Sequence, residues 1–115
     1  MATDIRAYLP NADISAQKAR LVVDMVRGQP VNEAVNTLRF TTKKAARIVG
    51  KLLNSAIANA EENFGVSRDD LVIFRIAADE GPTRKWRRFG ARGRFKPMLR
   101  RSAHITIVLR EREQA

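Results

Sequence analysis

The sequence predicts an α+β fold in which three helices pack on a small antiparallel three-stranded sheet and a long β-hairpin arm protrudes. Three observations carry this prediction. Apolar residues recur at helical spacing from Ser15 to Gly65, β-rich runs start at Leu71 and at His104, and a basic stretch separates the two runs. With 115 residues, we expect one domain over residues 1–115, with a globular part at about 1–80 and 102–115 and the hairpin at about 81–101.

Two helices are expected before residue 41. Ser15 can cap the first, which runs to about Arg27 and stops at Gly28. Its apolar face is formed by four residues at helical spacing: Leu21, Val22, Met25 and Val26. Pro30 opens the second helix, which ends near Phe40. Its apolar positions follow the same spacing: Val31, Ala34, Val35 and Leu38.

The longest helix is expected to begin after Thr41 or Thr42, either of which can cap it, and to continue to Gly65. Its apolar positions repeat at steps of three and four residues and are expected in the core: Ala45, Val49, Leu52, Leu53, Ala56, Ile57, Ala60 and Phe64. The opposite face carries Lys44, Arg47 and Lys51. This basic face is either a solvated surface or a binding surface, and the helix alone does not decide between them.

Three strands are expected. Residues 71–78 are rich in β-branched and aromatic side chains, and residues 104–109 alternate in polarity. Residues 5–9 also alternate and can cover an edge of the sheet. If the two longer strands pair, their connection from Asp79 to Ala103 is far longer than a usual hairpin loop. Continuing both strands outward would make an arm of roughly 30 Å.

The excess positive charge lies in this connection. The net charge is +10, and residues 81–110 contain ten Lys and Arg residues and no acid. A charge confined to one segment predicts an extended polyanionic partner. Arginine predominates, and its planar group pairs with phosphate and stacks on bases. Because Gly90, Gly93 and Pro97 break any amphipathic helix, we expect nucleic acid rather than a membrane as the partner.

Aromatic residues interleave with the cations of the arm. Trp86, Phe89 and Phe95 either stack on unpaired bases or pair with each other across the ribbon. The tip is expected within residues 89–93, where two glycines permit a tight reversal. Since the cations repel one another, we expect the arm to become ordered on its partner.

The chain does not have the residue types that catalysis requires. It has one histidine and no cysteine, so we expect no enzyme, no cofactor, no metal site and no disulfide, and a reducing compartment such as the cytoplasm. His104 opens a strand and is expected to be structural. The acid pairs at residues 69–70 and 79–80 are interpreted as strand-end charges that pair with arginines. Residues 79–82, Asp-Glu-Gly-Pro, are typical of a bend at the base of the arm.

Four stretches resemble, in the same order, the bacterial large-subunit ribosomal protein family numbered twenty-two: SAQKARLV at 15–22, NSAIANAE at 54–61, DEGP at 79–82 and HIT at 104–106. The resemblance implies a globular domain on the outer face of the large subunit near the polypeptide exit, with a hairpin that lines the nascent-chain tunnel. It implies binding to 23S ribosomal RNA, a part in subunit assembly, and a tip that affects macrolide sensitivity. The implied partners are this RNA, neighbouring ribosomal proteins and the nascent polypeptide, with the protein a monomer within the ribosome.

The resemblance, together with the charge pattern, selects the candidate site residues. Those expected to bind ribosomal RNA are Lys18, Arg20, Lys43, Lys44, Arg47, Lys51, Arg84, Lys85, Trp86, Arg87, Arg88, Arg92, Arg94, Lys96, Arg100 and Arg101. Those expected at the tunnel-facing tip are Arg88, Phe89, Gly90, Ala91, Arg92 and Gly93. By position, the residues that match the family's arm pattern are Lys85, Ala91, Gly93, Arg94 and Arg101.

The chain also departs from the family pattern. Where the family commonly has Pro-Arg-Ala near the tip, this chain has Phe89-Gly90-Ala91, so an expected arginine is missing, and Trp86 and Lys96 differ as well. The alternative function is a free-standing DNA-binding or architectural protein that uses a β-ribbon. Such proteins are usually symmetric dimers, and the sequence shows no spare apolar face for a dimer.

Overall fold

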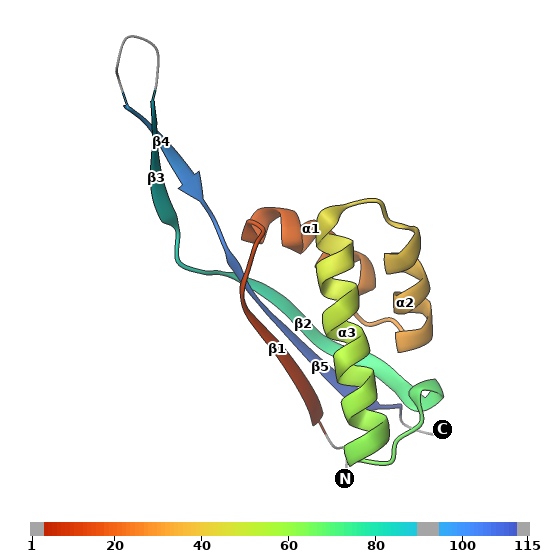
Figure 1. Cartoon of the computed structure of the whole chain (residues 1–115). Helices are drawn as coiled ribbons and strands as arrows, with labels where there is room; N and C mark the ends of the chain where they lie inside the picture. The colour runs from red at the N-terminus through yellow and green to blue at the C-terminus, as the bar shows by residue number, and fades with distance from the viewer. Residues whose placement is uncertain (1–3, 90–94, 113–115) are drawn as a thin grey trace.

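The computed structural model describes residues 4–89 and 95–112, and it describes side chains for residues 4–83 and 100–112. Three helices cover one face of a three-stranded antiparallel sheet, and a two-stranded ribbon leaves one end of that sheet (Figure 1). This arrangement confirms the predicted α+β class, including the protruding arm.

The sheet has β5 (Ala103–Glu111) at its centre, between β1 (Asp4–Ala12) and β2 (Leu71–Glu80). Both pairings are antiparallel, so the N-terminal segment covers an edge of the central strand as expected. Side chains on one face alternate into the core: Ile5, Leu71, Ile73, Ile76, Ile105, Ile107 and Leu109. Because strand side chains alternate between faces, this buried row fixes which face meets the helices.

The helices are α1 (Ala16–Val26), α2 (Val31–Phe40) and α3 (Lys44–Asn63), and a short 3-10 turn, η1 (Arg68–Asp70), precedes β2. The hydroxyl of Ser15 accepts a hydrogen bond from the Lys18 amide at 3.3 Å, and Gly28 has a φ of +79° just after α1. The expected start and stop of the first helix are therefore confirmed, as is the extent of the second.

The predicted threonine cap of α3 is wrong. The residue before the helix is Lys43, whose side chain makes no capping hydrogen bond. Thr41 instead donates its hydroxyl proton to the carbonyl oxygen of Thr37 at 2.7 Å, so it closes the end of α2. A threonine between two helices can serve either of them, and local sequence did not distinguish the two roles.

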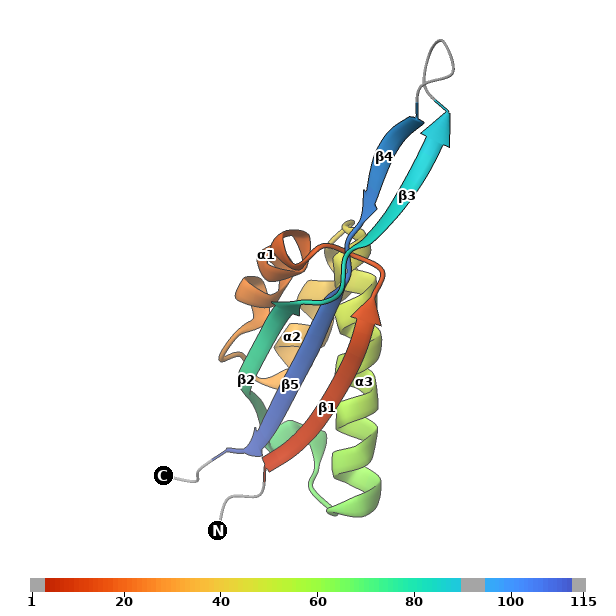
Figure 2. The ribbon, with the colours of Figure 1, turned by 90° about the vertical axis from the view of Figure 1, so that its left-hand side faces the viewer.

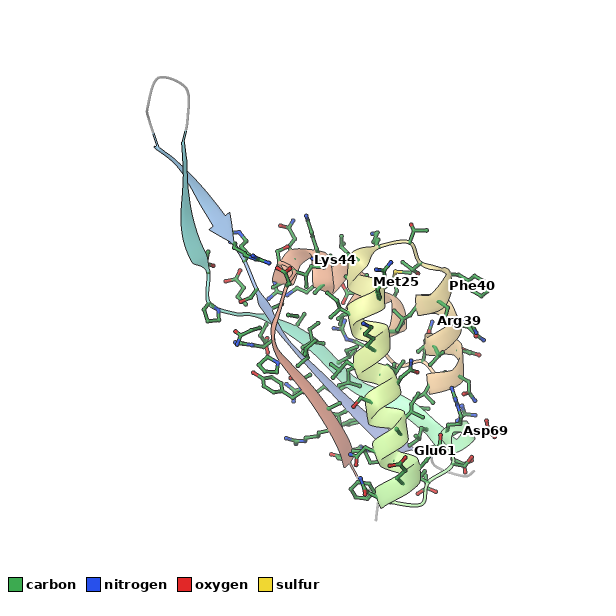
Figure 3. All side chains as sticks on the ribbon, in the orientation of Figure 1. Met25, Arg39, Phe40, Lys44, Glu61 and Asp69 are labelled. Carbon is green, nitrogen blue, oxygen red and sulfur yellow. The ribbon has the colours of Figure 1, made fainter. Side chains whose placement is uncertain are left out.

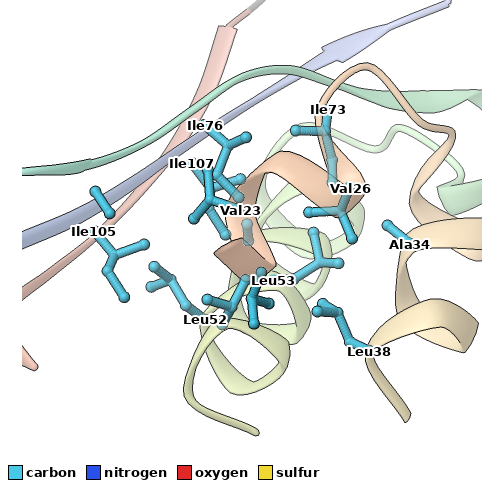
Figure 4. Close-up of a cluster of buried hydrophobic side chains, with 14 of the residues drawn as sticks. Val23, Val26, Ala34, Leu38, Leu52, Leu53, Ile73, Ile76, Ile105 and Ile107 are labelled. Carbon is cyan, nitrogen blue, oxygen red and sulfur yellow. The ribbon is translucent and has the colours of Figure 1, made fainter. Parts of the chain in front are cut away.

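The core lies between the helices and the sheet (Figure 4). In α1 the buried stripe is Ala16, Ala19, Val22, Val23 and Val26. Leu21 is 55% exposed and Met25 is 41% exposed, so the predicted apolar face of this helix is wrong at these two positions. Phe64, predicted as core, is 47% exposed. α1 packs its small side chains against β2 and α3, which rotates the larger Leu21 and Met25 to its flank.

The arm consists of β3 (Arg84–Phe89) and β4 (Phe95–Arg100), which pair antiparallel. The molecule measures 67 × 25 × 20 Å, and its radius of gyration is 17.3 Å, against about 13 Å for a compact chain of this length. The arm thus extends away from the globule, as predicted. The predicted tip residues Gly90, Ala91, Arg92 and Gly93 lie outside the described residues.

A break in the ladder separates the globule from the arm. The Gly81 amide donates to the Ser102 carbonyl at 2.9 Å, and the Ser102 hydroxyl donates to the Pro82 carbonyl at 2.8 Å. A Cβ atom on Gly81 would lie 2.5 Å from the Ser102 hydroxyl oxygen and 3.3 Å from the Ser102 carbonyl carbon. A larger residue would therefore displace the Ser102 side chain and crowd the facing segment. Of the residues predicted to form a bend, Asp79 and Glu80 still belong to β2, and the irregular link at the base of the arm is residues 81–83.

Truncating a buried and an exposed leucine will test the assignment of the core. Leu53 is fully buried, so Leu53→Ala should lower the free energy of unfolding by about 2 to 5 kcal/mol through loss of contacts and formation of a cavity. The matched variant Leu21→Ala, at an exposed position, should change it by less than about 0.5 kcal/mol. Urea denaturation measures both values. A loss below about 1 kcal/mol for Leu53→Ala would contradict the packing described.

Candidate nucleic-acid interface

Cations from three separate segments meet in a groove at the base of the arm, which we call the junction groove. They are Lys18, Lys43, Lys44, Arg100 and Arg101. The groove also contains the carboxylates of Asp13 and Glu80. Lys44 is labelled in Figure 3, at the end of α3 that faces the arm. The fold therefore brings together five of the cations that the sequence selected for RNA binding. The first and the last of them, Lys18 and Arg101, lie more than 80 residues apart in the chain.

Asp13 ties the arm to the globule within this groove. The Arg100 guanidinium donates from Nη2 to one Asp13 carboxylate oxygen at 3.0 Å and from Nε to the other at 3.2 Å. The Lys44 ammonium lies 3.4 Å from the same carboxylate. Hydrogen bonds from Arg100, and then from Lys44, hold the pKa of Asp13 below its usual range. All three side chains are more than half exposed, so solvent screens the attraction and the tie mainly provides orientation.

A second groove, the helix groove, runs between α2 and α3. Its cations are Arg39, Lys43, Arg47 and Lys51, and the described residues that line it include no acid. Lys43 belongs to both grooves, so the two form one continuous basic surface. The expected row of Lys44, Arg47 and Lys51 is therefore divided, because Lys44 turns to Asp13 while the other two face α2.

Arg20 was expected to bind RNA, but it has a structural contact. Its Nε donates to the Ala78 carbonyl oxygen at 3.0 Å, and Arg27 likewise donates to the Ile76 carbonyl at 3.1 Å. The two arginines hold α1 on β2. An RNA contact by Arg20 stays a prediction. Because Nε is bonded to Ala78, such a contact would use the two terminal nitrogens of the guanidinium.

The single histidine and Asp69 have structural contacts. His104 accepts a hydrogen bond at Nδ1 from the Asn11 amide at 3.1 Å, and its ring lies 6.0 Å from that of Tyr8. Asp69 accepts a hydrogen bond from the Asn32 side-chain amide at 2.8 Å, so its described hydrogen bond is not with an arginine. Among the described residues no three potential metal ligands gather in one place.

The arm's backbone register places one aromatic pair across the ribbon and leaves stacking on bases untested. Phe89 lies opposite Phe95, and Trp86 lies opposite Met98. The side chains of the expected RNA-binding residues between 84 and 99 lie outside the described part, so their contacts stay predictions. None of the described helices has the length and apolarity needed to cross a membrane.

Charge is polarised along the long axis of the molecule. The arm and both grooves are at one end. The acids Glu61, Glu62, Asp69 and Asp70 lie at the opposite end of the globule, where Glu61 and Asp69 are labelled in Figure 3. Arg68, Arg110 and Arg112 lie at this end as well, together with two further acids, Asp4 and Glu111, so this end is mixed but has more acids than cations.

Comparison with known proteins identifies the family. The sequence model of the ribosomal protein L22p/L17e family matches residues 7–110. The chain belongs to this family. It is 49% identical over 110 residues to large ribosomal subunit protein uL22 of Thermoanaerobacter sp. (strain X514), and the match covers 96% of this chain and 99% of that protein. The resemblance seen in the sequence is confirmed, and this member of the family is a structural component of the ribosome rather than an enzyme.

The tie at Asp13 gives a pH-dependent prediction. Because Arg100 and Lys44 lower the pKa of Asp13 in the folded state, the tie stabilises the fold above the ordinary pKa of about 3.9, and the stabilisation is lost as the pH falls through the lowered pKa. An NMR titration of the Asp13 carboxyl carbon should give a midpoint below that value. Arg100→Ala should raise the midpoint, whereas Arg101→Ala, in the same groove, should leave it nearly unchanged. A midpoint at or above about 3.9 in the unmodified protein would argue against the tie.

Proposed function

We propose that this chain, a structural constituent of the large ribosomal subunit, binds large-subunit (23S) ribosomal RNA through its arm and the adjoining grooves. The observation that carries the proposal is the continuity of positive charge. Nine Lys and Arg residues lie between Arg84 and Arg101, and the junction groove and helix groove extend this charge onto the globule. One folded polyanion can therefore contact the arm and all three helices together.

Binding follows from neutralisation of phosphates. Seven of the nine arm cations are arginines, whose planar group donates two parallel hydrogen bonds to a phosphate. A ribbon of two strands carrying this charge is marginally stable alone, and RNA removes the repulsion between its cations. A protein that holds one RNA segment on its globule and another on its arm links them, which is the basis for the proposed part in subunit assembly.

The proposed position in the subunit has the globule at the outer face and the arm in the nascent-chain tunnel. Two features support it in addition to the family resemblance. The long dimension of 67 Å lets one chain reach from a surface into the interior, and the predominantly acidic end of the globule points away from the RNA that the arm enters. Neighbouring ribosomal proteins and the nascent polypeptide are then the further partners, and the protein is one domain and a monomer within the particle.

Neutralising arm arginines will test the arm as the binding element. Each phosphate contact contributes about 0.7 to 0.9 to the slope of log affinity against log salt concentration. The triple variant Arg84→Gln, Arg87→Gln, Arg88→Gln should therefore flatten the slope for large-subunit RNA by about 2 to 3. Arg68→Gln, at the acidic end, serves as the control and should leave the slope unchanged. An equal slope for the triple variant and the unmodified protein would rule out phosphate contacts by these arginines.

Chemical footprinting will test the proposed position of the arm. Large subunits are rebuilt with the intact protein or with a variant in which residues 85–98 are replaced by a short turn. Protections at nucleotides that line the tunnel should disappear, while protections at the subunit surface are kept, because the globule retains its grooves. An identical pattern for both proteins would contradict an arm inside the subunit.

A further inference from the structure

The sheet has a second face that the helices do not cover. Figure 2 views this open face directly, with β2, β5 and β1 in front of the helices. Two aromatic side chains stand on it: Tyr8 is 57% exposed and Phe74 is 51% exposed. The face is distinct from both basic grooves, whose lining residues come from the helices, the loops beside them and the ends of the strands at the base of the arm.

A bulge in β2 places Phe74 outward. The register with β5 shifts between Ile73 and Arg75, so Phe74 and Arg75, although adjacent, are both exposed. The Arg110 guanidinium carbon lies 3.4 Å from the centre of the Phe74 ring, and Arg110 Nε donates to the Asp4 carboxylate at 2.8 Å. Arg110 therefore covers one face of the ring and holds it in place, while the residue as a whole stays 51% exposed.

Arginines flank these rings in a defined register. Val108 on β5 pairs with Arg6 on one side and with Arg75 on the other, which places the two arginine Cα atoms about 10 Å apart. The side chain of neither arginine makes a hydrogen bond or ion pair with another described residue. The pKa of Asp4 is lowered mainly by its hydrogen bond from Arg110, and the charge of Arg6 adds to this effect.

Both Arg6 and Arg75 line a groove along the open face. The groove is also lined by Phe74, Ala77, Thr106 and Val108 and by two carboxylates, those of Asp4 and Asp79. Because Asp4 is already paired with Arg110, Arg6 and Arg75 leave an excess of positive charge over Asp79. Tyr8 is paired with Thr106 in the neighbouring row.

We propose that the open face binds unpaired nucleotides of ribosomal RNA. Tyr8 and Phe74 stack on bases, and Arg6 and Arg75 bind the phosphates beside them. The proposal rests on the proposed RNA-binding function and adds to it a surface for single strands. Phosphate contacts alone do not distinguish a single strand from a duplex, whereas stacking on the rings requires unpaired bases. The hydroxyl of Thr106 provides a donor and an acceptor between the rings.

The charge pattern favours RNA over a protein partner on this face. A protein interface core is largely apolar and depleted of charge. On this face Val108 is apolar, but the groove around it is lined by four charged side chains, those of Asp4, Arg6, Arg75 and Asp79. A protein that covered Arg6 and Arg75 would have to supply acids for both, because burying an unpaired charge is costly. An RNA strand supplies a phosphate with every base, so it satisfies the rings and the arginines together.

Tyr8 provides a direct test because it is the only tyrosine of the chain. The full-length protein is titrated with a short single-stranded RNA of mixed sequence, and separately with a duplex of equal length, and the Tyr8 ring resonances are followed by NMR. Stacking predicts upfield shifts with the single strand and much smaller shifts with the duplex. Shifts of equal size with both RNAs would overturn the proposal.

Affinity for the same single strand gives the second measurement. The double variant Tyr8→Leu, Phe74→Leu keeps apolar bulk but removes both rings, and it should bind at least about fivefold more weakly for each ring lost. Tyr8→Phe should retain the affinity, and Phe64→Leu, at the acidic end and with similar exposure, is the matched control. Circular dichroism and thermal unfolding establish that the variants are folded.

The outcomes separate this proposal from the proposed function. If the single strand binds while the Tyr8 resonances and the affinity of the double variant stay unchanged, the open face is not the site, although RNA binding by the arm stands. If neither RNA binds, both proposals fail. If the double variant keeps its RNA affinity but no longer joins neighbouring proteins in rebuilt subunits, the face is a protein surface and the RNA assignment is overturned.

Discussion

The rest of the structure depends on the antiparallel pairing of β2 with β5. At one end this pairing places Ile105, Ile107 and Leu109 against the helices, and at the other it brings Gly81 against Ser102, where the arm leaves the globule. Since side chains alternate along a strand, a slip of one residue would turn the buried row outward and also displace the base of the arm. One register therefore determines both the core and the point from which the basic ribbon extends.

Local chemistry explains which elements could be predicted from the sequence. Ser15, Gly28 and Pro30 mark helix boundaries through their own backbone and side-chain preferences, and the structure places boundaries there. The set of α1 residues that face the core was harder to predict. Apolar spacing shows that a helix has an apolar side, but it does not show which residues of that side contact the neighbouring elements. Leu21 and Met25 lie on the flank because alanines permit close packing on the other side.

The candidate site was predictable by residue type but not by arrangement. The cations were visible in the sequence, yet their division into two grooves depends on how α2 lies on α3 and how the arm leaves the sheet. This packing adds Arg39, which no local pattern singled out, and turns Lys44 toward Asp13. It also gives Arg20 a backbone carbonyl as a partner. The open face escaped prediction for a related reason, since the bulge that exposes Phe74 is a property of paired strands.

Because charge is separated along the long axis, the protein can be oriented by the electric field of a partner before the two make contact. An approaching polyanion attracts the arm and the grooves and repels the end that carries Glu61 and Asp69. The resulting torque turns the protein while it is still diffusing, so that most encounters begin with the arm. At physiological ionic strength this orienting field extends about 8 Å from the surface of such a polyanion. Within that distance, productive collisions become more frequent without any sequence-specific contact.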